Sequence, residues 1–274
     1  MHRLTFSALP WTLLLGLVLS CGGDGRGDPI ELRFAAVVGD QPFECGTSYS
    51  GLGNGAELTP KDLRFYVHDV RLLREDGGEV PVVLDDDGKW QNGEVALLDF
   101  EDGCGDMGNA DLNDRILGVA PAGSYTGIRF KVGVPEALNH ADASLAGAPL
   151  NLTSLFWNWN AGYKFIRIDG TSDRFDSWRL HLGSTGCTGD MAGNATCTTP
   201  NIVEVSLEGF DPTATPVVAD LARLVEGSEL GNTGDSPPGC MSGPMDTDCA
   251  ALFANLGLPF GDAAGGNQRF FRTP

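Results

Sequence analysis

The chain has 274 residues, of which 42% are hydrophobic and 20% are charged, so it can bury a sizeable core and is not a disordered protein. Its formal net charge of -19 repels phosphate groups, which excludes nucleic-acid binding and docking on anionic lipid through charge. A binding module, a metal-binding protein and a partner of a basic protein are the classes that remain.

The N-terminus has the organisation of an export signal. Arg3 precedes an apolar run over residues 9–19, which is too short to cross a bilayer as a helix. The run ends in Val-Leu-Ser-Cys21, which resembles a bacterial lipobox. The sequence therefore predicts a signal peptide over residues 1–20 and a periplasmic or outer-membrane lipoprotein, held at the membrane only through lipid on Cys21. Cleavage without lipidation and release into the periplasm is the alternative.

Six cysteines remain in the mature chain: Cys45, Cys104, Cys187, Cys197, Cys240 and Cys249. An even number in an exported protein indicates disulfides, and the absence of a CxxC motif argues against a thiolate metal site. The sequence alone does not choose among the possible pairings. Closures between Cys187 and Cys197 and between Cys240 and Cys249 are local, and they would leave Cys45 to pair with Cys104.

Short runs rich in β-branched and aromatic residues follow a glycine-rich tether over residues 21–30. Separated by Gly, Asp, Asn and Pro clusters, these runs predict strands at residues 31–38, 62–73, 94–100, 125–134, 162–169, 178–183 and 201–207. Only residues 217–226 and 248–256 have helical spacing. We therefore expect one all-β domain over residues 31–274, an antiparallel β-sandwich or open barrel with long loops, two short helices and disulfide staples.

No motif for catalysis is evident in the sequence. Nucleophile elbow, P-loop and HExxH motifs are absent, and nothing pairs a nucleophile with a general base, so we do not expect an enzyme. Outside the export signal the histidines are His68, His140 and His181. So few imidazoles disfavour a hydrolytic mechanism but suffice for a metal site with two histidine ligands.

The most informative segment is residues 155–168, which contains two tryptophans. If it forms a strand, Trp157 and Trp159 point to the same face. Residues 169–173 predict a turn before a returning strand that carries His181, which would place Tyr163 nearly opposite His181 and Trp159 farther toward the Gly183 end. The pattern alone favours two core tryptophans beside a hydrogen-bonded histidine over a ligand site.

A longer series of motifs occurs in a fixed order through the chain. In order they read RFYV, ALLDF, FKVGVP, LNH, PLN, FWNWNAGYKF, HLGSTGC and PGCMSG, between residues 64 and 243. In this series the chain resembles the MbnP-like family of metallo-mystery-pair, four-cysteine proteins, over about residues 31–260. It is similar, more distantly, to the methanotroph surface copper proteins MopE and CorA.

This resemblance implies an exported copper-binding protein. In the family, a partner dihaem cytochrome c peroxidase resembling MauG oxidises a tryptophan to kynurenine, and the modified protein binds one copper ion. Kynurenine exposes an arylamine and a ketone that indole lacks, and copper(I) accepts imidazole nitrogen. The implied metal site comprises His140, His181 and the oxidised tryptophan, which is Trp159 or Trp157. The hairpin pairing above favours Trp159.

The remaining aromatic and imidazole side chains are expected to be structural. His68 lies where the family has no need of a histidine, and Trp90 and Trp178 are expected to pack. The acidic surface suits docking with a cytochrome of complementary charge. An alternative function is a cell-surface β-sandwich that binds carbohydrate or protein on Trp157 and Trp159, which requires exposed indoles.

Overall fold

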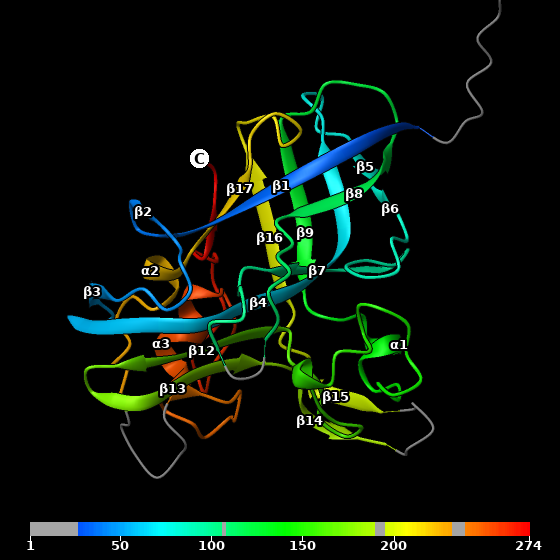
Figure 1. Cartoon of the computed structure of the whole chain (residues 1–274). Coiled ribbons are helices and arrows are strands. Elements are labelled where there is room, and N and C mark those ends of the chain that lie inside the picture. Colours follow the sequence, from blue (N-terminus) through cyan, green and yellow to red (C-terminus); the bar gives the residue numbers. More distant parts are fainter. Residues whose placement is uncertain (1–26, 106–107, 190–194, 232–238) are drawn as a thin grey trace, which may run out of the picture.

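The computed structural model describes residues 27–105, 108–189, 195–231 and 239–274 (Figure 1). The signal peptide predicted over residues 1–20 and the lipidation predicted at Cys21 lie outside the described residues. Within the described ranges, no helix is long and apolar enough to cross a membrane.

The larger sheet is organised around one long strand, β4 (Ala56–Leu73). In spatial order its strands are β16 (Val203–Glu208), β9 (Gly127–Val132), β4, β12 (Ile166–Ser172), β13 (Phe175–Leu182) and β18 (Gly239–Cys240), while β3 (Tyr49–Leu52), β5 (Glu79–Pro81) and β7 (Val95–Asp99) also pair with β4. Along one edge β4 changes partner from β12 to β9. Asp69, with φ of 48°, lies at a register shift in the pairing with β9. The sheet curls as a result (Figure 1).

A second sheet covers the concave side of this curl. Its order is β19 (Phe271–Arg272), β17 (Val217–Asp220), β1 (Asp28–Val38), β8 (Arg115–Ala120) and β6 (Val83–Leu84), with β2 (Gln41–Pro42) paired to β1. Figure 1 shows β1 crossing β16 and β9. The Phe34 ring of β1 lies 6.2 Å from Phe65 and 5.6 Å from Phe130 between centroids, so the aromatic core fills the space between the sheets.

The predicted all-β class with disulfide staples is confirmed, and most predicted strands are present. The differences lie at element ends and in sheet direction. The first strand begins at Asp28 rather than residue 31, β8 was not predicted, and β1–β17 and β13–β18 are parallel pairs. Parallel partners meet through long connections that leave no local turn signal in the sequence.

Three short α-helices, rather than the two predicted, occur in the described ranges: α1 (Glu136–Asn139), α2 (Leu221–Leu224) and α3 (Cys249–Asn255). Residues 217–220 of the first predicted helix form strand β17, since they pair with β1 and β19. The side chain of Asp220 then accepts a hydrogen bond from Ala222 N at 3.1 Å and caps α2.

The disulfides pair as the local closures indicated, Cys187 with Cys197, Cys240 with Cys249, and Cys45 with Cys104. The first joins β14 (Thr185–Thr188) to β15 (Thr196–Thr199), a separate two-stranded sheet. The second ties β18 to α3. The chain is thus stapled on both sides of the end of β13, which carries His181.

Candidate metal centre

The two tryptophans of the aromatic segment lie in different kinds of structure. After the 3₁₀ turn η1 (Thr153–Leu155), β10 (Phe156–Asn158) pairs with β11 (Gly162–Tyr163). The Asn158 Oδ1 atom accepts hydrogen bonds from the backbone N–H groups of residues 160 and 161 at 2.9 and 3.0 Å, which turns the chain. Trp159 therefore lies in the turn, and the prediction that both tryptophans share one strand face is wrong.

The predicted register of the following hairpin is also wrong. His181 pairs with Arg167 rather than with Tyr163, and residues 169–172 continue strand β12 instead of forming a turn. The reason is tertiary: β12 is hydrogen-bonded to β4 on one edge and to β13 on the other, which holds the Asp-Gly-Thr-Ser run extended.

His181 presents an unpaired ring nitrogen. Its side chain is buried, with 6% of the residue exposed, and Nε2 lies 2.6 Å from Oδ1 of Asp169. An ionised carboxylate only accepts, so Nε2 carries the proton and Nδ1 holds a lone pair. The Nδ1 atom is buried and has no hydrogen-bond partner. Burial, opposed by the bond to Asp169, lowers the pKa of His181 below its ordinary value, so the ring is neutral near pH 7.

Asp169 holds the tautomer of His181. Burial by itself would raise the pKa of this carboxyl group, but the hydrogen bond from His181 and the charge of Arg167 outweigh it and keep the pKa below its usual range. Arg167 Nε donates to Asp169 Oδ2 at 2.9 Å and also lies 3.0 Å from Asp62. The carboxylate–histidine pair resembles the outer-shell arrangement that orients imidazole ligands in metal proteins.

The Trp157 ring lies beside His181. The two ring centroids are 6.3 Å apart. The ring packs so closely on Gly183 that a Cβ atom there would come within 2.4 Å of Cζ3 of Trp157. Lys164 Nζ lies 5.9 Å from the Trp157 ring centroid, and burial, followed by the charge of Arg167, lowers the pKa of Lys164 to about 8. His181, Lys164 and Asp169 also line one cleft.

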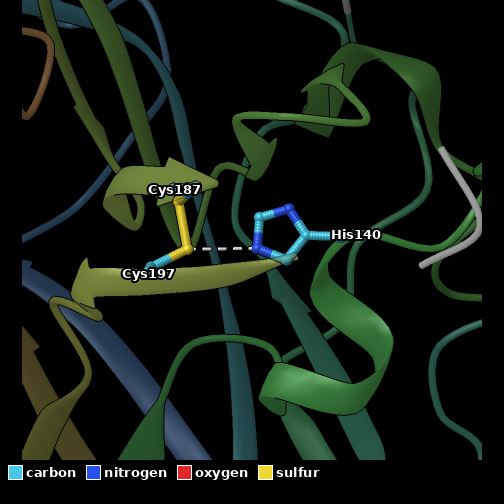
Figure 2. Close-up of side chains that lie close together, drawn as sticks. All are labelled: His140, Cys187 and Cys197. Atoms are coloured by element: carbon cyan, nitrogen blue, oxygen red, sulfur yellow. Dashed lines mark hydrogen bonds between the residues drawn. A yellow bond between two sulfur atoms is a disulfide. The ribbon is translucent and has the colours of Figure 1, made fainter. Parts of the chain in front are cut away.

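His140 reaches the same segment from the end of α1. It is 2% exposed, and its Nδ1 lies 2.9 Å from the backbone carbonyl oxygen of Trp159. A carbonyl only accepts, so Nδ1 carries the proton and Nε2 holds a lone pair. Nε2 lies 3.1 Å from Nδ2 of Asn139 and 3.2 Å from Sγ of Cys197 (Figure 2).

Asn139 fixes the position of this histidine. Its Oδ1 accepts from Tyr163 N at 2.9 Å, and its Nδ2 donates to Ser184 Oγ at 3.3 Å. Gly162, with φ of +74°, lies so close that a Cβ atom there would be 2.5 Å from Oδ1 of Asn139. Asn139 thus joins α1, β11 and the start of β14, and it accounts for a glycine at residue 162.

The structure brings both predicted histidine ligands to residues 157–159, His181 beside the Trp157 ring and His140 on the Trp159 backbone. In each ring one nitrogen faces an acceptor and the other can offer a lone pair, which fits a metal that takes imidazole nitrogen. In the described ranges, the groups of three or more His, Cys, Asp and Glu donors within 4.8 Å of one another are His140 with Cys187 and Cys197, and Asp102 with Cys45 and Cys104. Both contain a disulfide, whose sulfurs are not thiolate ligands.

The side chains expected to be structural lie elsewhere. His68 is on β4, where its Nδ1 lies 2.9 Å from Gly133 O. Trp178 is 1% exposed in the core. Trp90 is half-buried against the core, and Nζ of Lys89 lies 4.6 Å from its ring centroid. Asp169 was not predicted as a functional residue. In the sequence it is only a charged residue that alternates with isoleucines, and this pattern does not pair it with His181.

Known proteins support a family assignment. The family model for MbnP matches residues 27–242. Among solved structures, MbnP from Methylosinus trichosporium superimposes with a TM-score of 0.78 at 30% sequence identity, covering 89% of this chain and 97% of that one. No curated protein matches the sequence at a significant level. With three disulfides, the match suggests an exported protein, and it suggests metal binding. The chain belongs to the MbnP family.

Proposed function

We propose that this protein is an exported copper-binding protein whose site becomes competent when a partner dihaem cytochrome c peroxidase oxidises a tryptophan to kynurenine. His181 and His140 are the imidazole ligands, and the modified side chain completes the site. The observation that carries the proposal is the buried, unpartnered Nδ1 of His181 beside the Trp157 ring, in a chain of the MbnP family.

The donor set suits copper(I) or copper(II). Copper when bound would supply a soft, redox-active centre, which imidazole ligands accept in low-coordinate geometry. The chain's own part is to hold the proton of each ring away from the metal side: Asp169 holds it on Nε2 of His181, and the Trp159 carbonyl holds it on Nδ1 of His140. A buried donor fixed in one tautomer needs no reorganisation to bind.

We propose Trp157 as the oxidised residue. In the proposed reaction the partner peroxidase uses peroxide to break the C2–C3 bond of the indole, which gives N-formylkynurenine. Hydrolysis then releases C2 as formate and leaves a ketone and an arylamine on a ring that already lies beside His181. Trp159 was favoured from the sequence by a hairpin register that the fold does not have. Its contact with His140 uses only the backbone carbonyl, which any residue provides. In this proposal the oxidising equivalents come from the partner's haem, and the chain itself is not an enzyme.

The alternative of a stacking platform for carbohydrate has less support. It needs two exposed indoles, yet both Trp157 and Trp159 are half-buried, and the first packs on Gly183.

Copper titration of the mature protein, produced with and without the peroxidase, tests the proposal. We expect binding only after co-production, and loss of binding in His181→Ala and in His140→Ala. The matched control is His68→Ala, which removes a buried histidine that belongs to β4 and leaves the site residues in place. Equal copper binding by the parent and the three variants, all co-produced with the peroxidase, would contradict the proposal.

A further inference from the structure

The Cys187–Cys197 disulfide and His140 form a cluster of three donor atoms. Sγ of Cys187, Sγ of Cys197 and one nitrogen of His140 all lie within 4.8 Å of one another, and Nε2 of His140 points at the sulfur of Cys197 from 3.2 Å (Figure 2). The Nδ1 proton is held by the Trp159 carbonyl, so the nitrogen that faces sulfur is the one with the lone pair.

The hairpin that carries the two cysteines would keep them adjacent without the covalent bond. Cys187 and Cys197 are directly opposed in register, between the pairs Thr185–Thr199 and Thr188–Thr196. Both cysteines are half-buried rather than enclosed, so a reductant can reach them. Cys240 and Cys249, by contrast, are 0% exposed.

We propose that two-electron reduction of this disulfide converts the cluster into a second metal site. Its ligands for a thiophilic ion such as copper(I) are the two thiolates and Nε2 of His140. A dithiol reductant gives up two electrons and two protons and becomes a disulfide, while the S–S bond of the chain becomes two thiols. Each thiol releases its proton when the metal binds. Metal–sulfur bonds of about 2.3 Å and metal–nitrogen bonds of about 2.0 Å are compatible with donors this close.

The thiolate site itself does not depend on the proposed function, whereas the sharing of His140 between two centres rests on it. Thiolate sulfur and imidazole select copper(I) and zinc without any modified tryptophan. Because His140 serves both sites, the closed disulfide leaves His140 to the centre at Trp157, and reduction offers it two sulfur co-ligands. The thiol state of the hairpin would therefore decide which centre holds His140.

Cadmium(II) titration of the full mature chain tests this site apart from the first one. The protein is made without the peroxidase, so that its tryptophans stay intact, and is reduced without oxygen, freed of reductant and checked for strand content by circular dichroism. We expect a sulfur-to-cadmium absorption band at one ion per chain after reduction and none before. Because Cys45 and Cys104 are also open to a reductant, the titrated chain carries Cys45→Ser and Cys104→Ser, and alkylation mapping should then place the free thiols at Cys187 and Cys197.

Variants assign the ligands. The chain with Cys45→Ser and Cys104→Ser should show the band, and adding Cys187→Ser and Cys197→Ser to it should abolish the band. His140→Ala should weaken binding roughly tenfold or more, and His181→Ala should leave it unchanged. Unchanged affinity in His140→Ala would overturn the proposal. So would a reduced protein with both thiols free and no band, or one that has lost its strands.

Discussion

His181 and His140 approach the tryptophan segment from two differently built parts of the fold. His181 is on β13, near one edge of the large sheet, and a carboxylate that is itself held by Arg167 orients its ring. His140 follows a one-turn helix, and a backbone carbonyl and a neutral amide orient its ring. The first arrangement depends on charge and on the sheet, whereas the second depends on hydrogen bonds from loops and on a nearby disulfide.

This difference indicates which side chains the proposed copper centre needs. On the His181 side the ring of Trp157, the carboxylate of Asp169 and the missing Cβ of Gly183 are each used. On the His140 side, the histidine is hydrogen-bonded to the backbone carbonyl of Trp159 and not to its indole ring. Substitutions should therefore be more damaging on the first side.

The largest expected effect separates the two tryptophans. Trp157→Phe should abolish both kynurenine formation and copper binding, because it removes the ring beside His181. Trp159→Phe should keep both, since its backbone carbonyl still accepts from His140. Copper content and peptide masses of the two variants, co-produced with the peroxidase, measure this contrast. The reverse outcome would move the modification to Trp159.

A smaller effect is expected from the carboxylate. Asp169→Asn replaces an obligate acceptor with an amide that can also donate, so His181 is no longer fixed with its proton on Nε2. We expect copper affinity to fall by about 10–100-fold, with a changed pH dependence of binding. Isothermal titration at several pH values checks this. An affinity equal to that of the parent would show that the tautomer of His181 is fixed by something other than Asp169.

Glycine substitutions sharpen the comparison through stability. Gly183→Ala places a Cβ atom 2.4 Å from Cζ3 of Trp157, so we expect a loss of about 1–3 kcal/mol in the free energy of unfolding and a displaced indole. Gly93→Ala is the matched control, because no atom lies within 4 Å of its added Cβ, and its change should stay within about 0.5 kcal/mol. Denaturant unfolding and tryptophan fluorescence measure both. Equal stability of the two variants would contradict the close packing of Trp157.

The smallest expected effect is on the pH dependence of stability. Since burial depresses the pKa of His181 from 6.5, the unfolded chain takes up a proton on this ring more readily than the folded one. The unfolding free energy should therefore decrease as the pH falls below about 6.5, and less steeply in His181→Gln, which cannot titrate there. Parallel slopes for the two proteins would argue against a buried neutral ring.

Much of this account could be predicted from the sequence, but the pairing around the site could not. Strand composition indicated the all-β class, and cysteine spacing indicated the local disulfides. The hairpin register failed because β12 lies between β4 and β13, and pairing on both edges overrides the turn propensity of residues 169–173. The use of Asp169 depends on that register, so no local pattern could assign it.

The most direct test of the proposed tryptophan oxidation is peptide mass mapping across residues 155–164. The mature protein is purified for it from cells that also make the dihaem peroxidase. We predict the mass of kynurenine at Trp157, with Trp90 and Trp178 intact in the same digest as internal controls. Unmodified tryptophan at both Trp157 and Trp159, with active peroxidase present, would contradict the proposed function.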